Sequence, residues 1–235
     1  MSSSTIKDAI ERDIDTGVLA PGARLPTEPE LQAIYATGRH SVRRALAELA
    51  RDGRLSIEQG RGTFVLPRPR IDYAIGRRTR LRRNLGAQGI DVAGEALGCE
   101  LLPASARVAE ALRLNGGAEV VVTRRLTRAD DVPVSFGALF HDATRFAEFA
   151  ERRAVLGSVS AVYRSYGIDD YVRGSTTIHA RSAKPEEARQ LKQHADMPVM
   201  LVRAVDTLPD GTPIAFSEVI WSATRVKFSF APDDQ

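Results

Sequence analysis

The first 66 residues contain a succession of short periodic segments that few folds can accommodate. Apolar residues recur at helical spacing between Ile6 and Ile14, which predicts a first helix over about residues 5–16. Thr27 followed three residues later by Glu30 forms a capping box, so a second helix is expected to begin there and to reach about residue 35. A short turn at residues 36–38 then leads to a third helix, and the segment is predicted to be a compact helical unit.

The third helix, predicted over residues 39–51, separates an apolar face from a basic one. Two strand-like segments follow, 55–57 and 63–65, around a glycine-containing turn with Arg61 at its tip. Helix, turn, helix and β-hairpin in this order predict a winged helix-turn-helix whose third helix reads DNA. An ordinary amphipathic helix with a solvated basic face is the alternative. The face expected to meet DNA holds Arg39, His40, Ser41, Arg43 and Arg44, and the face expected to be buried holds Val42, Ala45, Leu46 and Leu49.

Arginine dominates the basic residues of the chain. Only four of the 33 basic residues are lysines, and seven arginines against one acid fall between Pro67 and Arg83. The guanidinium group can bind phosphate oxygens with two parallel hydrogen bonds, so this run suits a phosphate partner. A solvated basic linker explains the run equally well. Residues 67–78 are predicted to be that linker, because two prolines stiffen its start and no apolar period is visible.

Several classes of protein are excluded or disfavoured by composition. Cys99 is the single cysteine, so neither an intrachain disulfide nor a cysteine-rich metal site can form. The four histidines form no HxH or HxxxH pair, so no metal site is expected. No stretch approaches the roughly 20 apolar residues that span a bilayer. The N-terminus has no signal-peptide core, which favours the cytoplasm.

Residues 79–235 contain an internal duplication with an offset of about 80 residues. Each copy reads as strand, helix, strand, turn and strand, and each closes on the pattern D-x-x-P-[VI]-x-F, at residues 130–136 and 210–216. Two further helices are expected between the copies, over residues 144–151 and 155–166. Two such units predict one antiparallel sheet with helices packed on it, an α+β domain.

The segment PGARLPTEPELQAIYATGRHSVRRALAELARDGRLSIEQGRGTFV closely resembles the DNA-binding domain of GntR-family bacterial transcription regulators. The second domain resembles the UTRA effector domain of the HutC subfamily, whose fold is similar to that of chorismate lyase. The segments RTRLRRNLGAQG, DDVP, DGTP and SEVIWSATRVKFSF carry this second resemblance. Within the subfamily, YGIDDYVRGSTTIHAR and RVKFSF look most like the regulators of phosphonate utilisation. The implied domains are 1–66 for DNA binding and 79–235 for effector binding and dimerisation.

The resemblance implies which residues contact DNA. Arg39, His40, Ser41 and Arg43 correspond to the start of the family's recognition helix, and Arg61 and Gly62 correspond to the part of the wing that approaches the minor groove. Arg39 and Arg43 are the candidates for a forked contact to guanine, and a phosphate contact is the alternative for either. Pro29 stands where the family often has an arginine, so the usual operator sequence is not expected.

The resemblance also implies an effector cavity on one face of the sheet, near the first short helix of the second domain. Its arginines and a helix N-terminus suit a small anion, such as a phosphate or a phosphonate. A surface or fold-stabilising role is the alternative for each residue. The chain departs from the family pattern at Thr127, Ser222 and Thr224. The implied effector-binding residues are Thr79, Arg80, Arg125, Tyr171, Arg173 and Glu218.

The function implied is a ligand-responsive transcription regulator, a repressor that binds a palindromic operator in double-stranded DNA as a homodimer. It is expected at the nucleoid in the cytoplasm, without a cofactor. A regulator of the same subfamily that senses a metabolite without phosphorus is the first alternative. An enzyme with a DNA anchor is a remote one, because no Ser/His/Asp set appears and His141 and His179 each stand alone. An architectural DNA binder that senses no ligand is a third alternative, and the large duplicated second domain argues against it because it would have no function there.

Overall fold

The computed structural model describes residues 1–58, 60–66, 71–78, 80–193 and 195–230. The chain divides into two compact units, each described by itself below. The first unit comprises Met1–Ile71, Ser182–Val199 and Ala223–Val226. The second comprises Asp72–Arg181, Met200–Ser222 and Lys227–Gln235.

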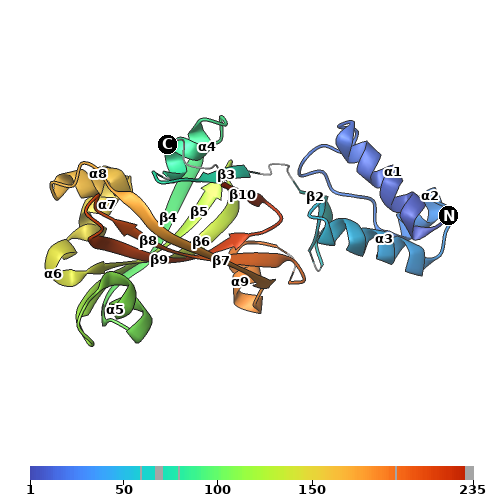
Figure 1. Cartoon of the computed structure of the whole chain (residues 1–235). Helices are drawn as coiled ribbons and strands as arrows, with labels where there is room; N and C mark the ends of the chain where they lie inside the picture. The colour runs from blue at the N-terminus through green and yellow to red at the C-terminus, as the bar shows by residue number, and fades with distance from the viewer. Residues whose placement is uncertain (59, 67–70, 79, 194, 231–235) are drawn as a thin grey trace. The chain divides into compact units, whose positions relative to one another are not determined.

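The N-terminal part of the first unit is the winged helix-turn-helix that the sequence predicts. Helices α1 (Ser3–Asp15), α2 (Glu28–Ile34) and α3 (Arg39–Arg51) pack together and precede the hairpin of β1 (Leu55–Glu58) and β2 (Gly62–Val65) (Figure 1). The capping box of α2 forms, with Glu30 accepting from the backbone of Thr27 at 2.7 Å. The apolar faces of all three helices meet in one core, which includes Ile6, Ile10, Leu31, Val42, Ala45, Leu46, Leu49, Leu55 and Val65.

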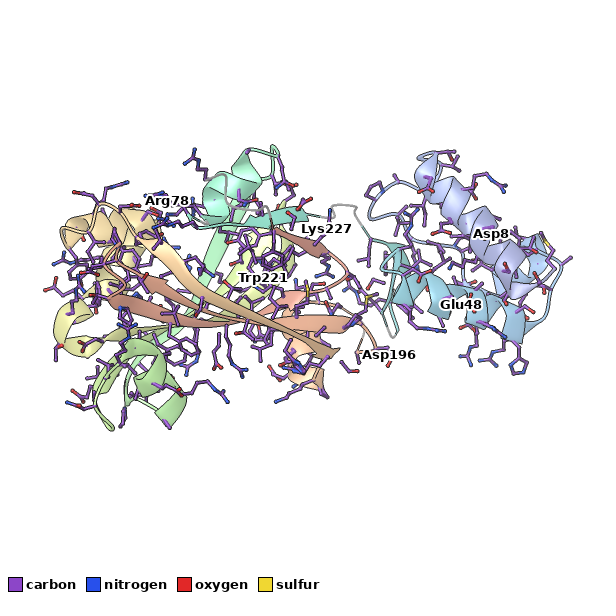
Figure 2. The ribbon with its side chains drawn as sticks, in the orientation of Figure 1. Asp8, Glu48, Arg78, Asp196, Trp221 and Lys227 are labelled. Atoms are coloured by element: carbon purple, nitrogen blue, oxygen red, sulfur yellow. The ribbon has the colours of Figure 1, made fainter. Side chains whose placement is uncertain are left out.

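The segment predicted to be a linker contains a strand. Residues 67–70 lie outside the described residues, but Ile71–Ile75 form β3, which pairs with β10 (Val226–Phe230). Ile71, Tyr73 and Ile75 alternate inward and are buried, so the linker prediction is wrong for these residues. The tyrosine ring stacks on Trp221, labelled in Figure 2, with 5.2 Å between ring centroids. These residues are therefore held in place by the burial of their apolar side chains and do not form a free linker.

The large sheet has six strands in the order β4-β5-β6-β9-β8-β7, and the duplication explains this order. Each copy contributes three neighbouring strands, and the copies meet where β6 pairs antiparallel with β9. Ala138 lies opposite Glu218 in this pairing, and these residues are separated by the offset of the duplication. The strands are β4 (Val92–Pro103), β5 (Glu119–Ala129), β6 (Val132–Asp142), β7 (Val172–Ser182), β8 (Pro198–Thr207) and β9 (Pro213–Ser222).

Helices cover both faces of this sheet. Helix α5 (Ala106–Leu112) packs on one face against Val120, Val122 and Phe216. On the opposite face, α6 (Ala143–Phe146), α7 (Phe149–Leu156) and α8 (Val159–Ser165) form an aromatic-rich core with Val121 and Ala215 (Figure 1). The remaining helices are α4 (Leu81–Gly86) in the second unit and α9 (Pro185–Gln190) in the first.

The two helices expected between the repeats are three in the described structure. The segment predicted as one helix over residues 144–151 is broken, because α6 ends at Phe146 and α7 begins at Phe149. The second prediction, over residues 155–166, spans a helix end. Gly157 adopts a left-handed conformation with φ of 71°, which ends α7, and the Ser158 side chain then caps α8.

Candidate functional site

The exposed face of α3 presents arginines held by a carboxylate on α2. Arg43 lies with Nε 3.0 Å from each carboxylate oxygen of Glu28, and Arg39 Nε lies 3.5 Å from one of them. Both arginine side chains are more than half exposed. His40 is exposed and Ser41 is half-buried beside them. The structure therefore brings Arg39, His40, Ser41 and Arg43 together at the start of α3, where the sequence analysis places a DNA contact.

The hairpin carries the other two residues expected at DNA. Arg61 is 76% exposed on its side chain and pairs with Glu58 at 2.5 Å. Gly62 has φ of 121°, in the region that favours glycine. A Cβ atom there would lie 2.7 Å from Nε of Arg24, so a side chain would be strained by the backbone conformation and would also displace the end of the Arg24 side chain. The glycine thus allows Arg24 to lie against the hairpin that presents Arg61.

A cavity of about 270 Å³ opens on the face of the sheet that carries α7 and α8. Its floor is formed by cavity-facing side chains of β5, β6 and β9, including Thr123, Ser135, Leu139, Ser217 and Val219. Helices α4, α7 and α8 contribute to its walls. Its charged lining is strongly unbalanced, because among the described lining residues a single acid, Asp206, stands against five arginines, Arg80, Arg82, Arg125, Arg153 and Arg173.

Three of these arginines act on one another. Burial, together with the charges of Arg125 and Arg82, lowers the pKa of Arg153 to about 10. Burial and the charge of Arg82 also lower the pKa of Arg125. Arg125 donates to the carbonyl oxygen of Gly94 at 2.5 Å, whereas the buried Nη1 of Arg153 has no hydrogen-bond partner among the described residues. A buried cation without a partner is costly, so this wall of the cavity favours an anion.

The opposite part of the cavity lining is internally paired. Arg173 donates through Nε to Asp206 at 2.7 Å, and both side chains are largely buried. Burial raises the pKa of Asp206 even though Arg173 favours its charged form. The Tyr171 hydroxyl hydrogen-bonds to Ser160 at 2.9 Å, and its ring lies 3.4 Å beneath the guanidinium of Arg80. These groups present hydrogen-bonding edges to the cavity while adding no net charge of their own beyond that of Arg80.

The structure brings together four of the six expected effector-binding residues, Arg80, Arg125, Tyr171 and Arg173. Thr79 lies outside the described residues. Glu218 is not in this cavity, because alternate side chains of a strand point to opposite faces and its neighbours Ser217 and Val219 take the cavity side. Glu218 instead accepts hydrogen bonds from Arg203 at 2.6 Å and from Arg107 of α5 at 3.3 Å.

The sequence analysis missed three residues of the charged lining, Arg82, Arg153 and Asp206. Arg82 lies in the basic run that was assigned to no particular contact. Arg153 follows Arg152 in α7, and nothing in the sequence shows which of the two faces the cavity. Asp206 stands in a half-buried strand of mostly apolar residues, where an acidic residue is unusual enough to have been a signal. Among the described residues, no group of His, Cys, Asp and Glu could hold a metal ion.

The fold and these two sites define a class of protein, a DNA-binding regulator with a ligand-binding domain, and family comparison agrees. Residues 2–65 match the gntR family of bacterial regulatory proteins, and residues 87–227 match the UTRA domain. The chain therefore belongs to the GntR family and carries a UTRA effector domain. It is a transcription regulator and not an enzyme.

Individual relatives extend over nearly the whole chain. An uncharacterized HTH-type transcriptional regulator of Rhizobium meliloti is 38% identical over 94% of this chain and 91% of its own length. The probable transcriptional regulator PhnF of Escherichia coli is 31% identical, covering 88% and 86%. The crystal structure of PhnF from Mycobacterium smegmatis has a TM-score of 0.67 at 26% identity and covers 98% of this chain and 100% of that one. In the described part of the chain, no helix is long and apolar enough to cross a membrane.

Proposed function

We propose that this regulator is a repressor that a small anionic effector releases from its operator. The observation that carries the proposal is the half-buried guanidinium of Arg153, which is repelled by two further arginines and whose buried Nη1 has no hydrogen-bond partner among the described residues. An anion in the cavity supplies the missing hydrogen-bond acceptors and the compensating charge at once. The repressor role is supported by relatives such as NagR of Bacillus subtilis, a transcriptional repressor 23% identical over 95% of this chain.

A phosphate- or phosphonate-bearing effector fits the charges best. A doubly charged group with three oxygens can accept from several guanidinium forks, and Arg82, Arg125 and Arg153 supply such forks at one wall. The rest of the cavity, with Leu139, Val159 and Val219, offers apolar contacts to the remainder of a small molecule. An effector without phosphorus, such as a carboxylate, is the alternative that the same arginines also favour, and it is an outcome of the test below.

DNA binding is assigned to residues 1–66. Arg39 and Arg43 lie where two guanidinium groups can enter the major groove, with His40 and Ser41 beside them, and Arg61 and Gly62 on the wing meet the minor groove or its phosphates. The sheet-bearing part dimerises, and the two-fold axis places the two recognition helices on half-sites of a palindrome about one helical turn apart. As a chromosome-binding protein, it acts at the nucleoid in the cytoplasm.

The effector acts by binding one arrangement of the dimer more tightly than another. A ligand shifts such an equilibrium only by its difference in affinity for the two arrangements. Moving a population from mostly bound to mostly released needs a preference of about 10⁴-fold. The cationic wall of the cavity can provide a large preference, because an arrangement that brings its arginines closer is strongly disfavoured until the anion is present.

The experiment measures binding of the full chain to the DNA upstream of its own gene, with and without a panel of phosphonates, sugar phosphates and carboxylates. It is done at two salt concentrations, because each phosphate contact adds about 0.9 to the steepness with which the logarithm of the binding constant falls with the logarithm of the salt concentration. Release by one phosphorus compound supports the repressor and its effector class, and release by a carboxylate alone selects the alternative. Saturating occupancy of the cavity with unchanged operator affinity would refute the mechanism.

A further inference from the structure

Glu28, the first residue of α2, is bound to both arginines expected to read bases. Its two carboxylate oxygens lie 3.0 Å from Nε of Arg43, and one of them lies 3.5 Å from Nε of Arg39. The two arginines are one helical turn apart on the exposed face of α3, so one carboxylate bridges them. Among the described residues, no other group pairs with either guanidinium.

The geometry leaves the reading edge of each arginine available. A guanidinium has five N–H groups. Arg43 uses the one on Nε in its hydrogen bonds to Glu28, and Arg39 approaches Glu28 with the same atom at the longer ion-pair distance of 3.5 Å. The terminal nitrogens retain four N–H groups, which can donate in parallel to O6 and N7 of a guanine. A carboxylate on Nε removes much of the rotamer freedom of a long side chain, so the free fork is held in one direction before DNA arrives.

We infer that Glu28 is a positioning residue that sets the sequence specificity of DNA binding by orienting Arg39 and Arg43. The inference rests on the proposed role of α3 as the base-reading helix. Glu28 itself contributes no attraction to DNA, since its charge repels phosphate. Its removal therefore weakens operator binding while it strengthens binding to DNA of any other sequence.

A purely structural role predicts something different. A carboxylate in the first turn of a helix interacts favourably with the helix dipole, so loss of Glu28 would destabilise α2 whatever α3 does. The cap of α2 does not need Glu28, because Thr27 and Glu30 form the capping box. A structural role would lower stability and affect operator and non-operator binding in the same proportion.

The experiment compares full-length Glu28→Ala and Glu28→Gln with Asp52→Ala. Asp52, which directly follows α3, pairs with Lys7 of α1 at 2.6 Å and supplies the matched control, because its removal deletes one carboxylate beside one cation that is not expected at DNA. Operator sequences are first selected from random duplex DNA with the wild-type protein. Affinity for the selected operator and for a scrambled duplex is then measured by fluorescence anisotropy, and thermal unfolding shows that each variant is folded.

We expect Glu28→Ala to lower the ratio of operator to scrambled affinity about tenfold, the discrimination of roughly one forked base contact. Glu28→Gln, whose amide oxygen can still accept from Nε, should lower it less, and Asp52→Ala should leave it unchanged. An unchanged ratio in Glu28→Ala overturns the inference. If the wild-type protein itself selects no sequence, the proposed function fails as well. A wild-type preference lost in Arg43→Ala and kept in Glu28→Ala refutes the inference alone.

Discussion

The replacement Arg153→Met should stabilise the free protein and abolish its response to anions. The variant removes a guanidinium that is half-buried, repelled by Arg125 and Arg82, and lacks a hydrogen-bond partner for Nη1 among the described residues. Methionine keeps the aliphatic part of the side chain and its packing in α7. The change therefore deletes the unfavourable charge without opening a large void.

The magnitude follows from the lowered pKa of Arg153. The pKa falls from 12.5 to about 10, and one pKa unit corresponds to about 1.4 kcal/mol, so the charged form is disfavoured by roughly 3 kcal/mol in the folded state. Solvent screening of a half-buried group reduces this to about 1–2 kcal/mol. Both pKa values lie above 7, so the cost is present in full at neutral pH and is relieved only as the pH rises through about 10. For a chain of this size the variant should raise Tm by about 3–6 °C.

The assay is thermal unfolding with and without added methylphosphonate or inorganic phosphate. An anion at ten times its Kd adds about 1.4 kcal/mol to the wild-type protein, and this increment should vanish in Arg153→Met. Binding can be followed directly by the fluorescence of Trp221, the single tryptophan, which stacks on the cavity-lining Tyr73. Arg152→Met is the matched control, because the neighbouring Arg152 pairs with Glu148 at 2.8 Å.

The control shows whether an effect comes from removing any arginine of α7 or specifically from removing Arg153. Arg152→Met should be no more stable than the wild type and should keep its anion response. The reasoning is refuted if Arg153→Met is less stable than the wild type in buffer without phosphate. It is also refuted if that variant keeps the full stabilisation by the anions that stabilise the wild type.

Two further predictions concern stability. Burial lowers the pKa of His141 to about 3. Between pH 6.5 and 3 the unfolded chain therefore binds a proton at this residue that the folded chain does not bind, so the folded state loses stability as the pH is lowered through this range. Urea unfolding should show the wild type losing about 2 kcal/mol more than His141→Gln between pH 7 and 5. Gly137→Ala should cost about 1–3 kcal/mol in the same assay, because its Cβ would lie 2.6 Å from Cα of Val219 and force β6 and β9 apart. The first prediction is contradicted if the wild type and His141→Gln lose the same stability between pH 7 and 5. The second is contradicted if Gly137→Ala is as stable as the wild type.

The order of the elements could be predicted because each depends on local rules. The capping box at Thr27 and the 3.6-residue period define the helices of the DNA-binding part, and the repeated D-x-x-P pattern marks equivalent hairpins. The strand at Ile71–Ile75 was missed although its apolar residues alternate, since five residues between prolines and arginines give a weak period. The helix break at Gly157 was missed because a left-handed residue becomes evident only when the following cap is known.

The cavity could be predicted only in part, for a different reason. Arg125 and Tyr171 were expected from a resemblance to other chains, and both line the cavity. Glu218 came from the same resemblance and lies on the other face. The strand pattern shows that Glu218 and its neighbours Ser217 and Val219 point to opposite faces. It does not show which face carries the cavity, because that depends on how the helices pack on the sheet. Arg153 depends on the same packing, since the face that α7 turns toward the sheet decides whether it or Arg152 enters the cavity.

The duplication gives the cavity two chemically different halves. The first repeat contributes Arg125, whose guanidinium lies so close to Gly94 that a Cβ there would be 2.6 Å from Nη2. The second repeat contributes Arg173 together with the carboxylate of Asp206, which neutralises it. The charge of Arg82 acts on Arg125, and the charges of both act on Arg153, so three of the five lining arginines gather beside the contribution of the first repeat. We therefore expect a ligand with one anionic end and an uncharged remainder to bind in a single orientation, with its anion against Arg82, Arg125 and Arg153.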